Sequence, residues 1–276
     1  MRIPVSLVAN AAVFAVLSTS VGAAEFDRYG GAAPDLVAIQ PASDFAFVLG
    51  VGIGTAPVYE GAAEYGVTFS PIIEVERFRI PGLIDIGGGE DVGGLSVAPS
   101  FSIASKRVSA EHTALVGLND VEATYALGAR IGYELVLNDV LRGELYGAAR
   151  YAVGGAEGFI GEAGVDITAK LTPQLEVVGG PLISFASENY MDTYFGVTAG
   201  EAAATGGRLG AYNPNGGVKS VGVQLAARYE IAPDNFLSAK GSYSGFVGDA
   251  LASPVVISGS QHQFTAGLGL ARRFAF

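Results

Sequence analysis

Apolar side chains alternate with small or polar side chains along most of the chain from Phe45 onward. In the first such segment, Phe45–Ile53, aromatic or branched residues occupy the odd positions and alanine, valine or glycine the even ones. A period of two is that of a β-strand, whose successive side chains point to opposite faces. The alternation returns in Val67–Val75, Leu95–Ile103, Val121–Tyr133, Leu141–Tyr151, Phe159–Leu171, Val221–Tyr229, Leu237–Tyr243 and Phe264–Phe276. The sequence therefore predicts an all-β protein.

The length of these segments distinguishes between two all-β architectures. Strands of globular proteins cluster near five or six residues, whereas strands that cross a membrane need roughly nine to eleven. Long segments predominate here, and Phe274 and Phe276 place aromatic rings at the end of the last one. We therefore predict a transmembrane antiparallel β-barrel, with apolar faces toward lipid and polar faces toward the lumen. In the alternative, a soluble sandwich, the apolar faces would meet in a core.

Turn-forming residues set the expected number of strands. Short connections are expected near Gly87, Asn138, Pro173 and Pro233, and longer ones at 55–65, 106–120, 187–217 and 247–261, with a shorter one near Gly155. Short periplasmic turns that alternate with longer outer loops predict about ten strands.

One segment leaves a second count open. Between Gly66 and Ile86 the apolar phase changes across Glu76-Arg77, where no turn-forming residue stands. We interpret this change as a bulge within one long strand. A hairpin at that point, with a further strand at Tyr194–Thr198, would instead give about twelve strands.

The first residues are typical of a secretory signal peptide. Arg2 precedes an apolar run from Val5 to Leu17, and small residues suited to cleavage follow at Ala23 and Ala24. The run is too short for a membrane helix, which needs roughly 18 apolar residues. We expect a signal peptide at 1–24, a periplasmic leader at 25–44 and a barrel of the Gram-negative outer membrane at 45–276.

Charge and composition exclude several classes of function. A net charge of −11 argues against nucleic-acid binding, which requires basic side chains, and the absence of cysteine excludes disulfides and thiolate metal sites. The polar faces of the strands carry acids and bases in nearly equal number. The nine acids are Glu74, Glu76, Asp85, Glu122, Glu134, Glu144, Glu162, Asp166 and Glu176, and the eight bases are Arg79, Arg130, Arg142, Arg150, Lys170, Arg228, Lys240 and Arg273. We expect ion pairs to fill most of the lumen.

The glycines at positions 50, 52 and 54 raise the possibility of a phosphate-binding loop. Their spacing is G-x-G-x-G, not the G-x-G-x-x-G of a dinucleotide site, and no helical pattern follows. We interpret them as the inner face of the first strand, where missing side chains would leave a narrow path for small solutes.

No catalytic, cofactor or metal site is predicted. A hydrolase would need a nucleophile and base in contact, and the chain offers only His112, close in sequence to Ser109 and Glu111, and His262, near Ser260. We interpret both histidines as loop residues without catalytic function. The acidic loops lack the D-x-[DN]-x-[DN]-G spacing of a calcium loop, so their charges are interpreted as solvated.

Several short segments resemble a known family. They are PVYEG at Pro57–Gly61, L-x-G-L at Leu115–Leu118, YFGVT at Tyr194–Thr198, the run from Tyr212 to Lys219, GDALASPVV at Gly248–Val256 and the final Phe276. In order and spacing they are similar to the MltA-interacting protein (MipA/OmpV) family, over about Phe45–Phe276. The resemblance implies an outer-membrane barrel without catalytic residues, and a scaffold that joins a murein lytic transglycosylase to a murein synthase.

The expected function is thus that of a non-enzymatic structural or scaffolding protein of the cell envelope, in contact with outer-membrane lipid. Murein enzymes would dock on the leader 25–44 and the short turns. The first alternative is a narrow channel for small solutes, gated by the long loop Ser187–Gly217. The second is a surface adhesin that uses its acidic outer loops.

Overall fold

The computed structural model describes residues 45–80, 84–86 and 93–276. The expected signal peptide (1–24), the expected leader (25–44) and the short connection near Gly87 lie outside these residues. None of the described helices is long and apolar enough to cross a membrane.

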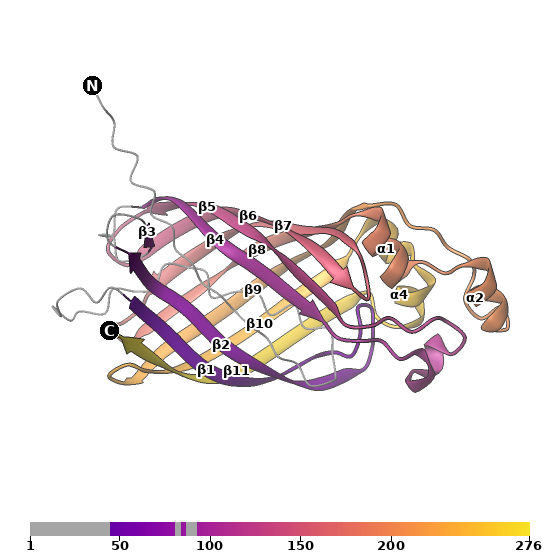
Figure 1. The fold of residues 1–276 in the computed structure, drawn as a ribbon, viewed down its shortest axis with the longest axis horizontal. Coiled ribbons are helices and arrows are strands. Elements are labelled where there is room, and N and C mark those ends of the chain that lie inside the picture. Colours follow the sequence, from indigo (N-terminus) through magenta and orange to yellow (C-terminus); the bar gives the residue numbers. More distant parts are fainter. Residues whose placement is uncertain (1–44, 81–83, 87–92) are drawn as a thin grey trace, which may run out of the picture.

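One antiparallel sheet forms most of the structure and curls around an interior (Figure 1). Its strands are β1 (Phe45–Pro57), β2 (Tyr65–Ile80), β3 (Ile84–Ile86), β4 (Gly94–Ala104), β5 (Thr124–Val136), β6 (Leu141–Gly154), β7 (Gly158–Lys170), β8 (Leu175–Ala186), β9 (Gly217–Ala232), β10 (Asn235–Phe246) and β11 (His262–Ala275). Their spatial order is β3-β2-β1-β11-β10-β9-β8-β7-β6-β5-β4. Sequence neighbours pair from β1 to β3 and from β4 to β11, and β1 also pairs with β11. The two edges of this sheet are β3 and β4.

The described helices all lie in the long connections at one end of the barrel (Figure 1). They are the 3₁₀ helices η1 (Ser109–Glu111) and η2 (Thr113–Leu115), and the α-helices α1 (Glu188–Phe195), α2 (Ala199–Ala204), α3 (Gly248–Ala252) and α4 (Pro254–Ser258). We call this end the loop end. The opposite end, which holds Phe45, Phe276 and the short connections near Asn138, Pro173 and Pro233, is the turn end.

The expected strand number is confirmed for the long strands, with one addition. Ten of the eleven described strands contain 11 to 16 residues, and β3 contains three. The bulge is confirmed too: Ala46 pairs with Arg77 and Phe47 with Val75, so Glu76 is the extra residue. The alternative of twelve strands is wrong, because Tyr194 and Phe195 end helix α1 and Val197 forms only an isolated bridge with Tyr212.

The apolar faces of the strands point outward, as a membrane barrel requires. Val51 is 71% exposed, Leu127 67% and Leu225 61%, and the alternate side chains of the same strands are buried or half-buried. A sandwich would bury the apolar face instead. The structure therefore excludes the sandwich and confirms the antiparallel barrel, whose outer surface meets lipid.

Candidate functional site in the barrel interior

An arginine and two carboxylates occupy the middle of the lumen. The Arg130 guanidinium on β5 donates to both carboxylate oxygens of Glu144 on β6, at 2.9 and 2.8 Å, and to Asp166 on β7 at 3.2 Å. Ser96 on β4 donates to Glu144 at 2.8 Å, and Gln224 on β9 donates to Asp166 at 2.7 Å. Buried charges persist only when paired and hydrogen-bonded, and this network meets that condition across five strands.

A second ion pair lies nearer the loop end. Arg150 on β6 is 1% exposed, and its Nη2 donates to Glu162 on β7 at 2.9 Å. Its Nε donates to the hydroxyl of Ser100 on β4 at 2.7 Å. The two ion-pair clusters together form a charged layer across the interior.

Glycine makes room for the middle network at one position. A Cβ on Gly132 would lie 1.9 Å from Glu144 Oε1, so any larger residue would displace the carboxylate that Arg130 binds. The sequence alone does not show this requirement for Gly132, because the clash depends on a side chain of the neighbouring strand.

Seven of the seventeen expected lumen charges are buried: Arg130, Glu144, Arg150, Glu162, Asp166, Glu176 and Arg228. Five more are half-buried: Glu134, Arg142, Lys170, Lys240 and Arg273. Glu122 was wrongly placed in the lumen, because it lies before β5 and is exposed. The side chains of Glu74, Glu76, Arg79 and Asp85 lie outside the described part of the structure.

Apolar side chains close the lumen at the turn end. Phe236 on β10 is 1% exposed and lies between two guanidinium groups, with Arg228 Cζ 4.8 Å and Arg273 Cζ 5.0 Å from its ring centroid. Val48 and Ile72 are buried on the inner faces of β1 and β2. Phe236 lies at an even position of β10, in phase with the inward-facing Ser238 and Lys240, so the alternation itself places the ring inside. The register shift beside it adds Ile231 to β9 and does not turn the ring. We predicted ion pairs in the lumen and did not predict this aromatic ring.

Helices close the loop end. Tyr190, Met191, Tyr194 and Phe195 of α1 are buried in a cluster with inward-facing residues of the strands and with residues of the β10–β11 connection. The other members are Val121, Ala126, Ala152, Ala156, Ile160, Ala186, Phe246, Ala250 and Val256. We call α1, α3, α4 and the residues of this cluster the cap. Burial raises the pKa of Tyr194 to about 12, so this phenol stays neutral.

Polar anchors fix the cap to the neighbouring connections. Arg107, buried in the β4–β5 connection, donates to the carbonyl oxygens of Tyr194 at 3.0 Å and Thr193 at 3.4 Å. Burial lowers the pKa of Arg107 from its usual value. The Ser253 hydroxyl donates to the Phe195 carbonyl at 2.6 Å and so joins α4 to α1.

The segments that carry the family resemblance meet at this end, except for the final Phe276, which lies at the turn end. A second buried cluster contains Tyr59 of PVYEG, Leu115 and Leu118 of L-x-G-L, Val197 of YFGVT and Val255 of GDALASPVV. These segments are far apart in the sequence, and their buried side chains pack together beside the cap.

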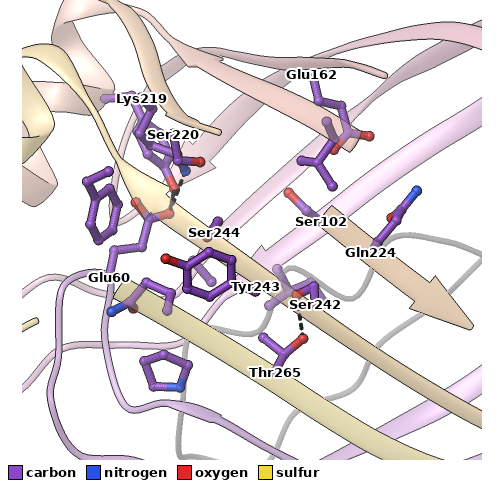
Figure 2. Close-up of a pocket in the computed structure, with 17 residues that line it drawn as sticks. Glu60, Ser102, Glu162, Lys219, Ser220, Gln224, Ser242, Tyr243, Ser244 and Thr265 are labelled. Atoms are coloured by element: carbon purple, nitrogen blue, oxygen red, sulfur yellow. Dashed lines mark hydrogen bonds and ion pairs between the residues drawn. The ribbon is translucent and has the colours of Figure 1, made fainter. Parts of the chain in front are cut away.

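A polar cavity of about 110 Å³ lies between the cap and the charged layer. Figure 2 shows Glu60, Lys219 and a group of hydroxyl-bearing side chains around it. Glu60, from the β1–β2 connection, accepts hydrogen bonds through Oε1 from Lys219 Nζ at 3.0 Å and from the Tyr190 hydroxyl at 2.8 Å. These contacts bind the β1–β2 connection to β9 and to helix α1 over the cavity. The Glu60–Lys219 pair spans 159 sequence positions, so no local pattern predicts it.

The glycines of β1 face the interior as expected, and their missing side chains leave room mainly for the neighbouring strand. Gly50, Gly52 and Gly54 pair with Ala271, Gly269 and Gly267 of β11. A Cβ on Gly50 would lie 2.3 Å from the Leu270 carbonyl oxygen, and one on Gly54 would lie 2.4 Å from that of Ala266. Their small size therefore allows β1 and β11 to approach closely. The cavity beside Gly52 and Gly269 measures about 20 Å³, close to the space one water needs.

Neither histidine ring forms a hydrogen bond with a serine hydroxyl among the described residues. His112 Nδ1 lies 3.2 Å from Glu64 Oε2, while the Ser109 hydroxyl donates to Asp120 at 2.6 Å and to the Leu118 carbonyl at 2.7 Å. His262 Nδ1 lies 2.8 Å from the Tyr243 hydroxyl. The Ser260 hydroxyl bonds only to the backbone of His262. The geometry assembles no nucleophile–base pair at either histidine.

Comparison with known proteins gives a family and a set of similar structures. The model of the family described as "MltA-interacting protein MipA" matches residues 49–274. No curated protein matches the chain. An outer membrane channel of Pseudomonas putida F1 is 12% identical, with a TM-score of 0.48, over 87% of this chain and 98% of the channel. The Ralstonia pickettii toluene transporter TbuX is 9% identical, with a TM-score of 0.32, over 86% of this chain and 90% of the transporter. The outer membrane protease OmpT of Escherichia coli is 10% identical, with a TM-score of 0.32, over 88% of this chain and 100% of the protease.

Proposed function

The chain belongs to the MltA-interacting protein MipA family and is a β-barrel of the Gram-negative outer membrane, and from this premise we propose that it is a non-enzymatic scaffold of the cell envelope. In this role the barrel anchors the protein in lipid and presents its periplasmic surface to murein enzymes. The partners would be a murein lytic transglycosylase and a murein synthase, which the scaffold holds together.

The observation that carries this proposal is the closure of the lumen by the described residues. The cap fills the loop end, Arg130 and Arg150 pair with carboxylates in the middle, and Phe236 fills the turn end. Open barrels of larger size conduct through an aqueous lumen. An interior filled with paired charges and apolar side chains supports an anchoring role over a general pore.

The turn end is the surface on which we expect partners to dock. Short connections are typical of the periplasmic side of such barrels, and Phe45, the first described residue, lies at this end. The family description, which names interaction with MltA, supports a partner of this kind.

Crosslinking in intact cells tests the scaffold. Photo-crosslinking residues are placed at Asn138 and Gln174, in two exposed turn-end connections, and as a matched control at Thr113, exposed at the loop end. A murein hydrolase or synthase crosslinked from the turn-end positions and not from Thr113 is the expected result. Capture of neither enzyme from any turn-end position would contradict the scaffold while leaving the barrel intact.

A narrow channel for small solutes is the second candidate, favoured by the polar cavity beneath the cap. In that case the Ser187–Gly217 loop, which contributes α1 to the cap, acts as the gate. Planar-bilayer recordings distinguish the two. We expect no discrete conductance from the wild-type protein, whereas steps of constant size that Met191→Ala enlarges would favour the channel.

A further inference from the structure

We propose that the polar cavity between the cap and the charged layer is a binding site for a small, uncharged solute with several hydroxyl groups. The inference goes beyond the scaffold role, since anchoring requires no ligand inside the barrel. It stands on the size of the cavity, the chemistry of its lining and one carboxylate oxygen that has no hydrogen-bond partner in the described part of the chain.

The lining is rich in hydroxyl and amide groups. Five serine or threonine hydroxyls, two tyrosines and two amides line the cavity: Ser102, Ser220, Ser242, Ser244, Thr265, Tyr190, Tyr243, Gln224 and Gln263. Figure 2 labels most of them. The Ser242 and Thr265 hydroxyls bond to each other at 2.7 Å, which uses only one of their two protons. A hydroxyl both donates and accepts, so this lining can serve the alternating donors and acceptors of a polyol.

The charges at the cavity are compensated within the protein. Glu162 pairs with Arg150 at 2.9 Å, and Glu60 pairs with Lys219 at 3.0 Å. A charged ligand would enter without an unpaired partner of opposite sign and would lose its hydration, which is costly in a buried site. The electrostatics therefore select a neutral solute.

Glu60 supplies the specific anchor. Its Oε1 accepts from Lys219 and Tyr190, but Oε2 is buried and has no hydrogen-bond partner among the described residues. An unsatisfied buried acceptor costs about 1–3 kcal/mol. A hydroxyl donated by the solute would satisfy this oxygen.

The volume limits the size of the solute. A cavity needs about 10–15 Å³ to hold one water, and drug-sized ligands occupy pockets of roughly 300–1,000 Å³. At about 110 Å³ the cavity accepts several waters or one small molecule. A polyol of the size of glycerol or erythritol fits this range.

Saturation-transfer NMR on the refolded full-length protein in detergent micelles tests the site, with erythritol as the probe. We expect saturation of the erythritol protons by the wild-type protein. Ser244→Leu fills the cavity and should abolish the transfer. Thr113→Leu, an exposed substitution outside the cavity, should leave it unchanged. Betaine, a small zwitterion without hydroxyl groups, should show no transfer that depends on the cavity, so that Ser244→Leu leaves its signal unchanged.

Heat-modifiable migration on a gel verifies that each variant is folded. If Ser244→Leu does not fold, Glu60→Gln replaces it: this variant exchanges an acceptor for a donor at the anchor and should reduce the transfer several-fold. The proposal would be overturned if the wild type transferred no saturation to erythritol, or if the wild type and the cavity variant transferred it equally. The crosslinking result for the scaffold would be unaffected by either outcome.

Discussion

The loop end and the turn end of this barrel are both closed, but by different parts of the chain. At the loop end, long connections fold into helices, and α1 inserts Met191 and Phe195 against the inner faces of the strands. At the turn end, the closure comes from strand residues themselves, chiefly Phe236 between Arg228 and Arg273. The cap is thus an added unit, whereas the turn-end closure belongs to the barrel wall.

This difference explains where the family resemblance lies. Tyr59, Leu118 and Val197 belong to segments typical of the family, and all three are buried at the loop end. Their packing is enough to account for their residue types. The short turns carry no such segment, so a partner that docks there would contact residues under few packing constraints.

A matched pair of substitutions gives the sharpest test of the comparison. Phe195→Ala in the cap and Phe236→Ala at the turn end each remove a buried ring, at a cost of about 3–5 kcal/mol. We expect Phe236→Ala to lower the free energy of unfolding of the whole barrel in urea. Phe195→Ala should instead increase amide hydrogen exchange in residues 188–204, with little change in the urea midpoint. A fall of both midpoints by the same amount would show that cap and barrel unfold as one unit.

Loss of an ion pair in the charged layer should destabilise the whole barrel, since the layer lies between the two ends. Arg130→Ala leaves the carboxylates of Glu144 and Asp166 buried without their cation. Breaking a buried ion pair in this way lowers the free energy of unfolding by about 3–5 kcal/mol. Urea unfolding in detergent measures the loss. The control is Asp234→Asn, which removes a partly exposed partner 3.7 Å from Arg273 and should cost less than about 1 kcal/mol. Similar losses for the two variants would contradict a buried network.

A smaller effect is expected from the glycine that faces Glu144. Gly132→Ala forces its Cβ into the carboxylate and should destabilise the barrel by about 1–3 kcal/mol, as overpacking does. At Gly143 the nearest atom to an added Cβ is Ile167 Cδ1 at 3.6 Å, an ordinary contact. Gly143→Ala should therefore be neutral or slightly stabilising. Equal urea midpoints for the two alanine variants would show that Glu144 can move without cost.

The barrel wall could be predicted from the sequence because its signals are local. Period-two alternation fixed the faces of the strands, and the phase change at Glu76 predicted the bulge. The inward direction of Phe236 follows from the same alternation, but its contacts with Arg228 and Arg273 could not be predicted, since they join different strands. The pairing of Glu60 with Lys219 could not be predicted either, because the two residues are far apart in the sequence.

The helices of the loop end did leave local signals that the strand pattern obscured. Thr198 and Glu201 form a reciprocal capping box at the start of α2, and Ser253 followed by Pro254 begins α4. Both are sequence signatures of a helix N-terminus. Tyr194–Thr198 was considered as a strand because Tyr, Phe, Val and Thr favour strands, and the packing of α1 against the barrel overrode that preference.

The smallest expected effect is a loss of stability at the loop end when the pH falls. Asp249 accepts from the backbone N–H and the side-chain amide of Asn215, at 2.7 and 2.8 Å, and these bonds hold α3 to the loop before β9. They lower the pKa of Asp249. The pKa of an aspartate in the unfolded chain is about 4, and the pKa of Asp249 in the folded protein lies below it. The stabilisation is therefore fully present above the unfolded pKa and is lost as pH falls through the folded pKa.

We therefore expect hydrogen exchange of residues 211–217 and 248–252, corrected for intrinsic rates, to increase as the solution is acidified below about pH 4, before the turn end responds. Asp249→Asn cannot titrate, and its exchange in these segments should vary less with pH than that of the wild type. The exposed position of Asp249 keeps the effect small. The same acid response in wild type and variant would assign it to another carboxylate of the loop end, such as Asp120, whose pKa is lowered by the Ser109 hydroxyl and N–H. Asp120→Asn would then remove it.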